Sequence, residues 1–264
     1  MLEWRLRLGS GRGRGRLGLP TSIQSPRISL VLPTYNEAPH FESFLSQLVE
    51  AFHREGCESF EIIVVDDNSA DGTGALADQF AERYPGAARA VHREQRGGLA
   101  TAVLEGWNVA RAPILAVMDA DGQHPVELPL RLLRTVEQGA DLAVASRYCP
   151  GGETPNWSLV RRLVSRVATG LARLVLPTAV SSIRDPLSGC FAVRRAVVAG
   201  KELRPLGTKI LLEVLARCEV NSVEEVPYRF APRPAGRSKA GVQDFIWYVQ
   251  HLWRLAGIPR EARR

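Results

Sequence analysis

"LAVMDADGQHP", residues 115–125, joins an apolar run to two aspartates, Asp119 and Asp121, that stand one residue apart. An apolar run that ends in polar residues is typical of a buried strand that leaves the core. A carboxylate at that position costs desolvation free energy unless a positive group meets it. The stretch therefore predicts a strand whose carboxyl end presents two acids to a cation.

Other stretches have the same form, an apolar run rich in β-branched residues that ends in polar residues. Together they predict strands over "ISLVLPT" (28–34), "FEIIVVDD" (60–67), "ILAVMDAD" (114–121) and "DLAVASRY" (141–148). Continuous apolar strands favour a parallel sheet that is buried on both faces. Helices are expected at 38–54, 72–84, 97–111 and 125–138. This alternation predicts an α/β fold with a Rossmann-like, mostly parallel sheet flanked by helices.

Polar side chains follow each predicted strand at its carboxyl end. In doubly wound sheets, ligands bind beyond that edge. The residues expected to meet there are Asn36, Glu37, Asp66, Asp67, Asp119, Asp121 and Arg147. We therefore expect a single binding site assembled from these strand ends.

The charge balance favours an acidic partner. The chain of 264 residues has 34 Lys and Arg against 28 Asp and Glu, which gives a net charge of +6 and a pI near 9.5. Such a surplus suits nucleic acid, anionic lipid or a phosphorylated substrate. Nearly all the cations are Arg, whose planar guanidinium makes bidentate contacts with phosphate.

The cysteines and the apolar segments bear on the cellular location. Cys57, Cys149, Cys190 and Cys218 lie far apart and form no CxxC pair, which indicates reduced thiols rather than a zinc site or a disulfide framework. No stretch reaches the roughly 18 uninterrupted apolar residues that a membrane span needs. The first residues also lack the apolar core of a secretory signal. We therefore expect a cytoplasmic protein.

Three regions are expected along the chain. Residues 1–26 are rich in Gly and Arg without a period, which predicts a disordered tail. For this tail, a solvated state is favoured over contact with RNA or anionic lipid, and no nucleic-acid partner is expected. The α/β domain is expected over 27–241, and an amphipathic helix with a short tail over 242–264.

Two segments of the C-terminal half have an amphipathic pattern. Residues 157–176 have arginines among apolar residues, and residues 242–258 contain Phe245, Trp247, Tyr248 and Trp253. Aromatic and apolar residues with basic neighbours suit a membrane interface. Packing against the domain explains either helix equally well, so both interpretations stay open.

The acids at the end of the predicted strand 114–121 suit a divalent metal. An Asp-x-Asp pair directs both carboxylates to one side of a turn, and Gln123 adds a neutral oxygen. Oxygen ligands of this kind suit Mg²⁺ or Mn²⁺, held by few protein groups and completed by substrate phosphates. The predicted positive partner is therefore a divalent metal that carries a diphosphate.

Two further motifs follow strands. "VVDDNSADGT" (64–73) combines turn and N-cap residues with a carboxylate that could accept from a nucleotide base or a ribose hydroxyl. "RGGLATAV" (96–103) is glycine-rich before a helix but lacks the Gly-Lys-Ser/Thr of a Walker A loop, so we expect it to cover or support a sugar. His92 and His124, as single histidines, are expected to be structural.

Several motifs in order give the chain a family resemblance. They are "PTYNE" (33–37), "VVDDNSADGT", "RGGLATA", "MDADGQHP", "ASRY" (145–148), "DPLSGCFAVRR" (185–195) and "EVPYRFAPRPAGRSK" (225–239). Over about residues 28–255, this series resembles the dolichol-phosphate (polyprenol-phosphate) mannosyltransferases, which are inverting glycosyltransferases of the GT-A fold.

The resemblance implies donor and metal sites. Pro33, Tyr35, Glu37, Val65 and Asp67 would hold the guanosine part of GDP-mannose. Asp119, Asp121 and Gln123 would coordinate Mg²⁺ or Mn²⁺ on the diphosphate, with Ala120 against the donor. Arg233 and Lys239, in the loop "RPAGRSK", would close on the phosphates.

It also implies an acceptor site and a catalytic set. Arg147 would face the reacting centre and contact both donor and acceptor. Arg161 and Ser165 match the positions that bind the acceptor phosphate. The implied catalytic residues are Asp121, Arg147 and Lys239. The implied product is a polyprenyl-phosphate β-mannose, made by a peripheral protein at the cytoplasmic face of a membrane.

Alternatives remain for the function. The same fold could use another donor such as UDP-glucose, or the chain could be a silent nucleotide-sugar-binding subunit of a membrane complex. The set of Asp119, Asp121, Gln123 and Arg147 argues against a silent subunit. An RNA-binding protein that uses the Arg/Gly tail is a third reading.

The chain departs from the family pattern in two places. Cys190 stands where the family usually has an aromatic residue, which bears on acceptor packing. Many relatives continue into transmembrane helices, whereas this sequence ends soon after residue 258. Peripheral attachment, an anchoring partner subunit and a truncated form are all compatible with that ending.

Overall fold

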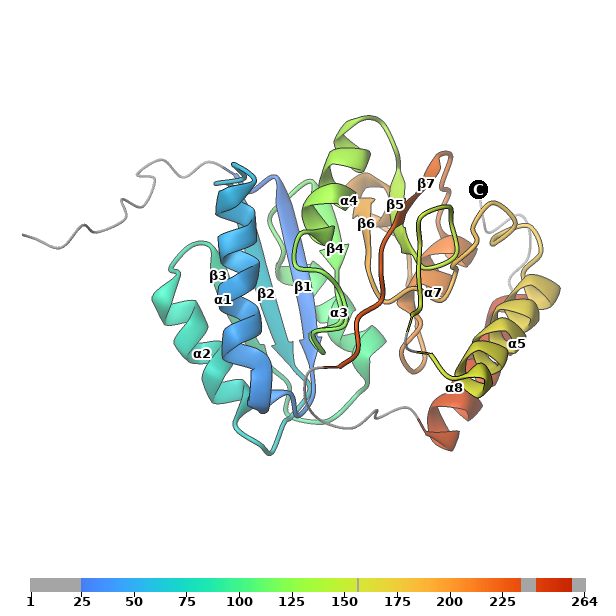
Figure 1. The fold of residues 1–264 in the computed structure, drawn as a ribbon, viewed down its shortest axis with the longest axis horizontal. Coiled ribbons are helices and arrows are strands. Elements are labelled where there is room, and N and C mark those ends of the chain that lie inside the picture. The colour runs from blue at the N-terminus through green and yellow to red at the C-terminus, as the bar shows by residue number, and fades with distance from the viewer. Residues whose placement is uncertain (1–24, 156, 234–240, 258–264) are drawn as a thin grey trace, which may run out of the picture.

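The computed structural model describes residues 25–155, 157–233 and 241–257. Its centre is a seven-stranded sheet of order β3-β2-β1-β4-β6-β5-β7 (Figure 1). The strands are β1 (Ile28–Thr34), β2 (Phe60–Asp66), β3 (Ala88–His92), β4 (Ile114–Val117), β5 (Leu142–Ser146), β6 (Phe191–Arg194) and β7 (Val223–Pro227). Only β6 runs antiparallel to its neighbours, so the predicted mostly parallel α/β sheet is confirmed.

Helices cover both faces of the sheet. They are α1 (Ala38–Arg54), α2 (Thr73–Arg83), α3 (Leu99–Val109), α4 (Leu128–Glu137), α5 (Leu159–Val175), α6 (Arg195–Val198), α7 (Ile210–Arg217) and α8 (Val242–Ala256). One core joins α1, α2 and α4 to the sheet, and a second joins α3, α5, α7 and α8 to the opposite face. Alternate residues of β1 divide between the cores, with Leu30 in the first and Val31 in the second.

The predicted strands and helices of the first half are confirmed with small changes at their ends. The largest change is in β4, which ends at Val117 rather than at residue 121. The backbone N–H of Met118 still donates to the carbonyl of Val31, 3.2 Å away. The chain leaves the sheet directly after that bond, so Asp119 and Asp121 lie in the following turn.

Strands β3, β6 and β7 were not predicted. They are four or five residues long, and β3 and β7 are only partly buried. Such short runs lack the continuous apolar pattern by which the longer strands are recognised. The antiparallel β6 lies between β4 and β5 and pairs with both of them.

Helices α5 and α8 lie side by side at one end of the sheet (Figure 1). The hydroxyl of Tyr248 on α8 donates to the carbonyl of Ala168 on α5 at 2.6 Å. On its other side, α8 is joined to α7 by a contact of 2.6 Å between His251 Nε2 and Glu213 Oε2, both fully buried. The tail predicted over 1–26 falls almost entirely outside the described residues, as do residues 258–264.

Candidate active site

The carboxyl ends of β1, β2, β4 and β5 lie along the same edge of the sheet, as predicted, because these strands all run in one direction. The segment 228–233 leaves β7 and crosses the sheet toward the end of β1 (Figure 1). It therefore brings residues from the last strand to the ends of the first ones.

The turns after β1 and β2 are joined by hydrogen bonds. The N–H of Asn36 donates to Ser69 Oγ at 2.9 Å, and Asn36 Oδ1 accepts from the N–H of Ala70 at 3.0 Å. The N–H of Glu37 donates to Thr73 Oγ1 at 2.9 Å. Asn36 has a φ of 53°, a left-handed conformation that Asn tolerates better than most residues. These contacts give the site a rigid edge.

Asp67 holds the glycine-rich loop. Its carboxylate accepts from the N–H groups of Gly97 and Gly98, each at 2.9 Å, and from Arg93 Nη1 at 2.7 Å. Gly98 has a φ of 91°, which a residue with a Cβ rarely adopts. The motif "RGGLATAV" is therefore tied to the end of β2. Arg93 was not among the predicted site residues.

Other residues expected to bind the donor line the same edge, Pro33, Tyr35 and Val65 at the guanosine and Ala120 elsewhere on the donor. Pro33 and Val65 are directly paired in neighbouring strands. The guanidinium of Arg96 stacks on the ring of Tyr35, with 4.1 Å between Cζ and the ring centroid. The carbonyl of Ala120 lies 3.2 Å from His40 Nε2. Together, these residues border the space beyond the ends of β1 and β2.

Asp121 and Gln123 bind the segment that follows β7. Asp121 Oδ2 accepts from Arg233 Nη2 at 2.8 Å, and its Oδ1 accepts from the N–H of Gln123 at 3.1 Å. Gln123 in turn donates from Nε2 to the carbonyl of Ala231 at 3.1 Å. Arg233 Nη1 also lies 3.8 Å from Glu37 Oε1. Arg233 thus bridges the ends of β1 and β4.

Asp119 faces several positive groups. His124 Nε2 is 3.8 Å from Asp119 Oδ2, and Lys209 and Arg147 act on it at longer range. Burial would raise the pKa of Asp119, but His124, followed by Lys209 and Arg147, lowers it below its ordinary value. A Cβ at position 189 would overlap the Asp119 carboxylate, so Gly189 provides its space.

The donor set at the end of β4 fits a divalent metal. The carboxylates of Asp119 and Asp121 follow one strand, and Asp119 is only half-buried. Among residues 25–155, 157–233 and 241–257, no group of three or more His, Cys, Asp or Glu side chains forms a complete metal site. Two carboxylates suit Mg²⁺ or Mn²⁺ only where phosphate oxygens and water complete the coordination. The set therefore fits a metal that binds together with a diphosphate.

Arg147, at the end of β5, is fixed by Asp185. Its Nε and Nη2 donate to the two carboxylate oxygens at 2.7 Å each. Burial alone would lower the pKa of Arg147, but the hydrogen bonds and charge of Asp185 hold it above its ordinary value. The rings of Tyr148, Trp157 and Phe230 surround the guanidinium at 5.1–5.7 Å from Cζ.

Arg161 rests on two of the same rings. Its Cζ lies 4.4 Å from the centroid of Trp157 and 5.3 Å from that of Phe230. Burial, and next the positive charge of Arg147, lower the pKa of Arg161. Ser165, one turn further along α5, contacts the hydroxyl of Tyr148 at 2.8 Å. The predicted acceptor residues therefore lie next to Arg147.

The structure adds residues to the predicted set. Asp185, Trp157, Phe230 and Lys209 lie around Arg147, and burial lowers the pKa of Lys209 against the attraction of Asp119. Asp185 and Phe230 stand inside motifs quoted from the sequence, and Trp157 begins the amphipathic segment 157–176, but nothing in these patterns indicates a contact with Arg147. His124, expected to be structural, stacks on Tyr228 at 5.1 Å. Lys239, predicted to be catalytic, lies outside the described residues.

Comparison with known proteins decides the family. The sequence matches the family described as "Glycosyl transferase family 2" over residues 29–199. The chain belongs to glycosyl transferase family 2. It is 38% identical over 256 residues to the polyprenol monophosphomannose synthase of Mycolicibacterium smegmatis, which covers 92% of this chain and 93% of the relative. It is 32% identical over 236 residues to the dolichol-phosphate mannosyltransferase of Saccharomyces cerevisiae, with 86% of each covered.

A further relative is longer than this glycosyltransferase. The dolichol-phosphate mannosyltransferase of Pyrococcus furiosus is 39% identical over 229 residues, which are 87% of this chain but 63% of that protein. These relatives confirm the predicted resemblance to the dolichol-phosphate and polyprenol-phosphate mannosyltransferases.

Solved structures confirm the GT-A fold of this glycosyltransferase. Glucosyl-3-phosphoglycerate synthase of Mycobacterium tuberculosis, in complex with Mn²⁺, UDP and product, has a TM-score of 0.66 at 21% identity. That match covers 89% of this chain and 81% of the other. Mannosyl-3-phosphoglycerate synthase of Rubrobacter xylanophilus has a TM-score of 0.65, also at 21% identity, over 90% of this chain and 76% of the other.

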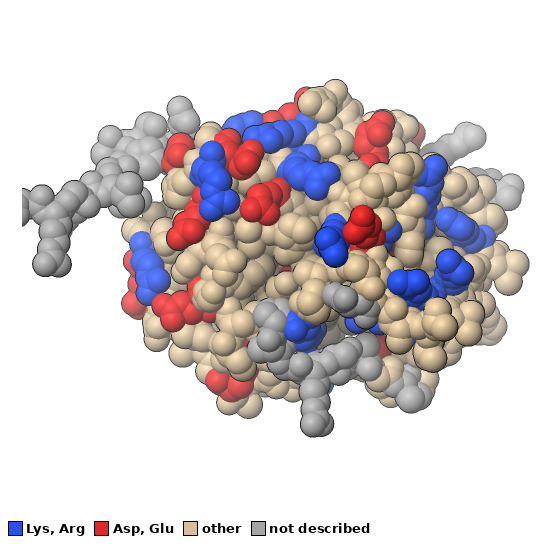
Figure 2. Space-filling view, viewed as in Figure 1, with Lys and Arg blue, Asp and Glu red and all other residues tan. Residues whose placement is uncertain are grey.

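The glycosyltransferase presents an apolar face beside this site, which we call the α5–α8 face. Its residues are Leu159, Val160, Leu163, Val164, Val167 and Leu174 of α5, with Phe245, Ile246, Val249 and Trp253 of α8, all exposed. Blue side chains gather over α5 in Figure 2, whereas blue and red alternate over α1. Trp253 is 82% exposed, but Trp247 packs against Gly207. In the part of the chain that is described, no helix is long and apolar enough to cross a bilayer.

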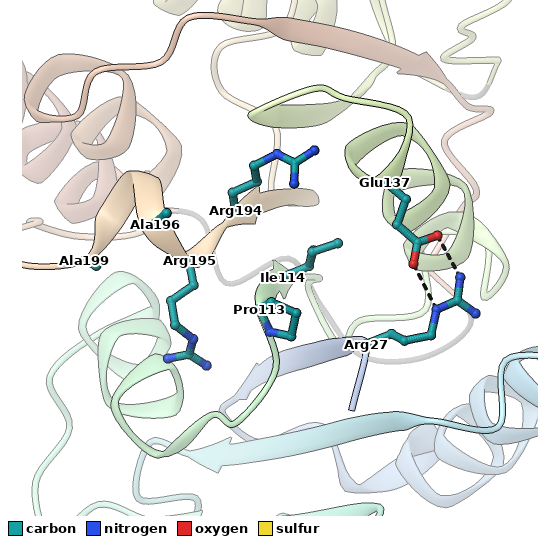
Figure 3. Close-up of a pocket in the computed structure, with 8 residues that line it drawn as sticks. All are labelled: Arg27, Pro113, Ile114, Glu137, Arg194, Arg195, Ala196 and Ala199. Atoms are coloured by element: carbon teal, nitrogen blue, oxygen red, sulfur yellow. Dashed lines mark hydrogen bonds and ion pairs between the residues drawn. The ribbon is translucent and has the colours of Figure 1, made fainter. Parts of the chain in front are cut away.

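A separate hollow of about 650 Å³ lies at the opposite edge of the sheet (Figure 3). Its three arginines point to different acceptors. Arg27 pairs with Glu137 at 2.7 Å, Arg194 Nε donates to the carbonyl of Ala140 at 3.0 Å, and Arg195 Nε donates to the carbonyl of Ala112 at 2.8 Å. Because the guanidiniums diverge, the hollow does not form a common anion site.

Proposed function

We propose that this glycosyltransferase moves mannose from GDP-mannose to a polyprenyl phosphate, with inversion at the anomeric carbon. The observation that carries the proposal is the placement of Arg147 and Arg161 on the same two rings. The positive charge of Arg147 acts on Arg161 even though Asp185 pairs with Arg147, and an anion bound between the two guanidiniums would offset that repulsion. The names of the relatives support a lipid phosphate as that anion.

The donor would bind along the same edge of the sheet, at the ends of β1 and β2. Pro33, Tyr35, Glu37, Val65 and Asp67 border the space proposed for guanosine. Since Asp67 already accepts from two glycine N–H groups and Arg93, its part in donor binding would be to hold the loop at 97–98 in place. Glu37 is the more accessible carboxylate for the base. Ala120 would then lie against the sugar-phosphate.

Asp119 and Asp121, with Gln123, would hold Mg²⁺ or Mn²⁺ at the diphosphate. The bound metal would stabilise the negative charge that develops on the departing diphosphate. Arg233, which contacts Asp121 at 2.8 Å, would bind the same diphosphate. For Lys239 we propose the same role on sequence grounds alone.

The acceptor needs no general base. A lipid phosphate is largely deprotonated near neutral pH because its second pKa is about 6. One phosphate oxygen attacks the anomeric carbon from the side opposite the diphosphate. The new carbon–oxygen bond forms as the old one breaks, and GDP leaves with the bonding electrons. An α-linked mannose thus becomes β-linked, while Arg147 and Arg161 reduce the repulsion between the two anions.

The α5–α8 face supports attachment to the cytoplasmic side of a membrane. Apolar side chains beside arginines are typical of helices that lie in the interface of an anionic bilayer. Arg161 and Ser165 belong to the same helix as this face. A lipid held by its phosphate at Arg161 would therefore have its chain next to the bilayer.

A donor screen with a polyprenyl-phosphate acceptor tests the proposal. GDP-mannose and UDP-glucose are each incubated with the enzyme in lipid vesicles, with Mg²⁺ or Mn²⁺ and with EDTA. We expect transfer from GDP-mannose that stops in EDTA, and a β-linked product by NMR. Transfer from UDP-glucose alone would contradict the donor assignment. Absence of transfer from every donor, with nucleotide binding retained, would favour a silent subunit.

A further inference from the structure

We propose that Asp185 is a positioning residue: it fixes the guanidinium of Arg147 in the orientation that the acceptor phosphate requires. The proposal rests on the proposed function, in which Arg147 meets that phosphate. Asp185 would not touch either substrate, and its effect would pass through Arg147.

The contacts of Asp185 define one orientation of Arg147. Asp185 is fully buried and accepts from the backbone N–H of Arg147 at 3.0 Å as well as from Nε and Nη2 at 2.7 Å. When Nε and Nη2 face one carboxylate, Nη1 is the edge of the planar guanidinium that points away from it. Asp185 therefore determines which edge of Arg147 faces the substrates.

Asp185, in the loop before β6, is itself fixed by hydrogen bonds. Its backbone N–H donates to Glu225 Oε1 at 3.0 Å, and its carbonyl accepts from the N–H of Ser188 at 3.2 Å. Arg147 ends β5, Asp185 precedes β6 and Glu225 belongs to β7. Three neighbouring strands therefore hold the pair, and the rings of Trp157 and Phe230 restrict the guanidinium further.

The charge of Asp185 opposes that of Arg147, so the pair cannot serve to increase the attraction for phosphate. The pair instead fixes the orientation of the guanidinium. A guanidinium that need not reorganise stabilises the transition state more. Loss of Asp185 should then reduce turnover of the acceptor and leave nucleotide binding nearly unchanged.

Glu61 provides a matched control. It is also fully buried, and it also accepts from the backbone N–H and the Nε of an arginine, here Arg111 at 2.9 and 2.6 Å, while Arg89 Nη2 lies 3.6 Å from it. It lies toward the amino ends of β1 and β2, away from the strand ends that form the site. Glu61→Gln therefore reports what a buried carboxylate that pairs with arginine contributes to stability, away from the site.

The experiment compares Asp185→Asn with Glu61→Gln in thermal unfolding, in GDP binding by calorimetry and in steady-state kinetics. Both variants should lower Tm. We expect only Asp185→Asn to lower kcat/KM for the acceptor, by about 10- to 100-fold, through misplacement of a contact group. Affinity for GDP should stay within about twofold in both. The proposal is overturned if Asp185→Asn leaves kcat/KM within the range of Glu61→Gln.

A double-mutant cycle tests whether the effect of Asp185 on acceptor turnover passes through Arg147. In an Arg147→Ala background, adding Asp185→Asn should lower kcat/KM for the acceptor by less than about a further twofold. Effects of residues that act as a unit are not additive. A full additional loss would overturn the proposal. If Asp185→Asn does not fold, Glu225→Gln takes its place, with a few-fold loss expected that also vanishes with Arg147→Ala. Wild-type turnover, measured first, tests the proposed function separately.

Discussion

On the β1–β2 side of the site, backbone N–H groups bind side chains of the neighbouring turn, as Asn36 does with Ser69 and Glu37 with Thr73. On the β5 side, guanidiniums of Arg147 and Arg161 rest on aromatic rings, and the adjoining helix exposes apolar residues. The first side is a fixed frame, suited to a rigid nucleotide. The second is made of long side chains next to an apolar face, suited to a flexible lipid phosphate.

The largest expected effect is the loss of transfer when Asp121, a proposed metal ligand between the two sides, is replaced. Asp121→Ala should reduce transfer by about 10²- to 10³-fold or more, since it removes a ligand of the metal that we propose stabilises the leaving diphosphate. The circular dichroism spectrum should not change. Asp78→Ala, which removes an exposed carboxylate of α2, should keep full activity. Full activity of Asp121→Ala in EDTA would show that neither side depends on a metal.

The next effect is on the stability of the fold and concerns the contact of Glu213 on α7 with His251 on α8. Burial raises the pKa of Glu213, but His251, the N–H of Arg204 and Arg217 lower it further, so the folded pKa lies below the ordinary value. The stabilisation is therefore complete above the ordinary pKa of a glutamate, about 4.3, and is lost as the pH falls below it toward the lowered pKa of the folded state. Glu213→Gln should cost about 3 kcal/mol of unfolding free energy at pH 7 and flatten this acid-side loss.

Chemical denaturation at several pH values measures that change. Glu42→Gln, which breaks an exposed pair with Arg83, should cost less than about 1 kcal/mol at every pH. An equally small cost for Glu213→Gln would mean that the α7–α8 contact does not stabilise this part of the fold.

A smaller effect distinguishes donor from acceptor binding. Arg161→Ala should raise KM for polyprenyl phosphate about 10- to 100-fold, the equivalent of about 1.5–3 kcal/mol for a charge-assisted phosphate contact. GDP affinity, measured by calorimetry, should hardly change. Arg166→Ala removes the same charge from the same helix and controls for attraction to the membrane. If Arg161→Ala weakens GDP as much as the acceptor, the assignment of sides is wrong.

The smallest effect is expected at the α5–α8 face. Trp253→Ala should reduce flotation with anionic vesicles about three- to tenfold, because one exposed aromatic side chain of several is lost. Trp247→Ala should lower Tm instead, since Trp247 packs against Gly207. Equal flotation of Trp253→Ala and the wild type would mean that this side does not enter the bilayer.

The two sides also differ in how far the sequence predicts them. Strands β1, β2 and β4 have long apolar runs, so both the sheet and the acids at its edge were predicted. The partner of Arg147 was not, because Asp185 is one polar residue in a loop, and only β6 brings it near β5. The ring pair of Trp157 and Phe230 likewise joins residues from distant segments. Local sequence patterns predict individual strands and helices, whereas these side-chain contacts depend on how the strands, helices and loops pack against one another.

The antiparallel β6 has a consequence for the order of folding. Strands β4 and β5, which are followed by Asp119 and Arg147, do not pair with each other, because β6 lies between them and pairs with both. During synthesis, the chain must therefore extend through β6, which ends at Arg194, before Asp119 and Arg147 can be fixed near each other. Contacts of such long sequence separation form slowly because of the entropy of loop closure. The turns after β1 and β2 can therefore assemble early, whereas the ends of β4 and β5 are brought together only after β6 has been synthesised.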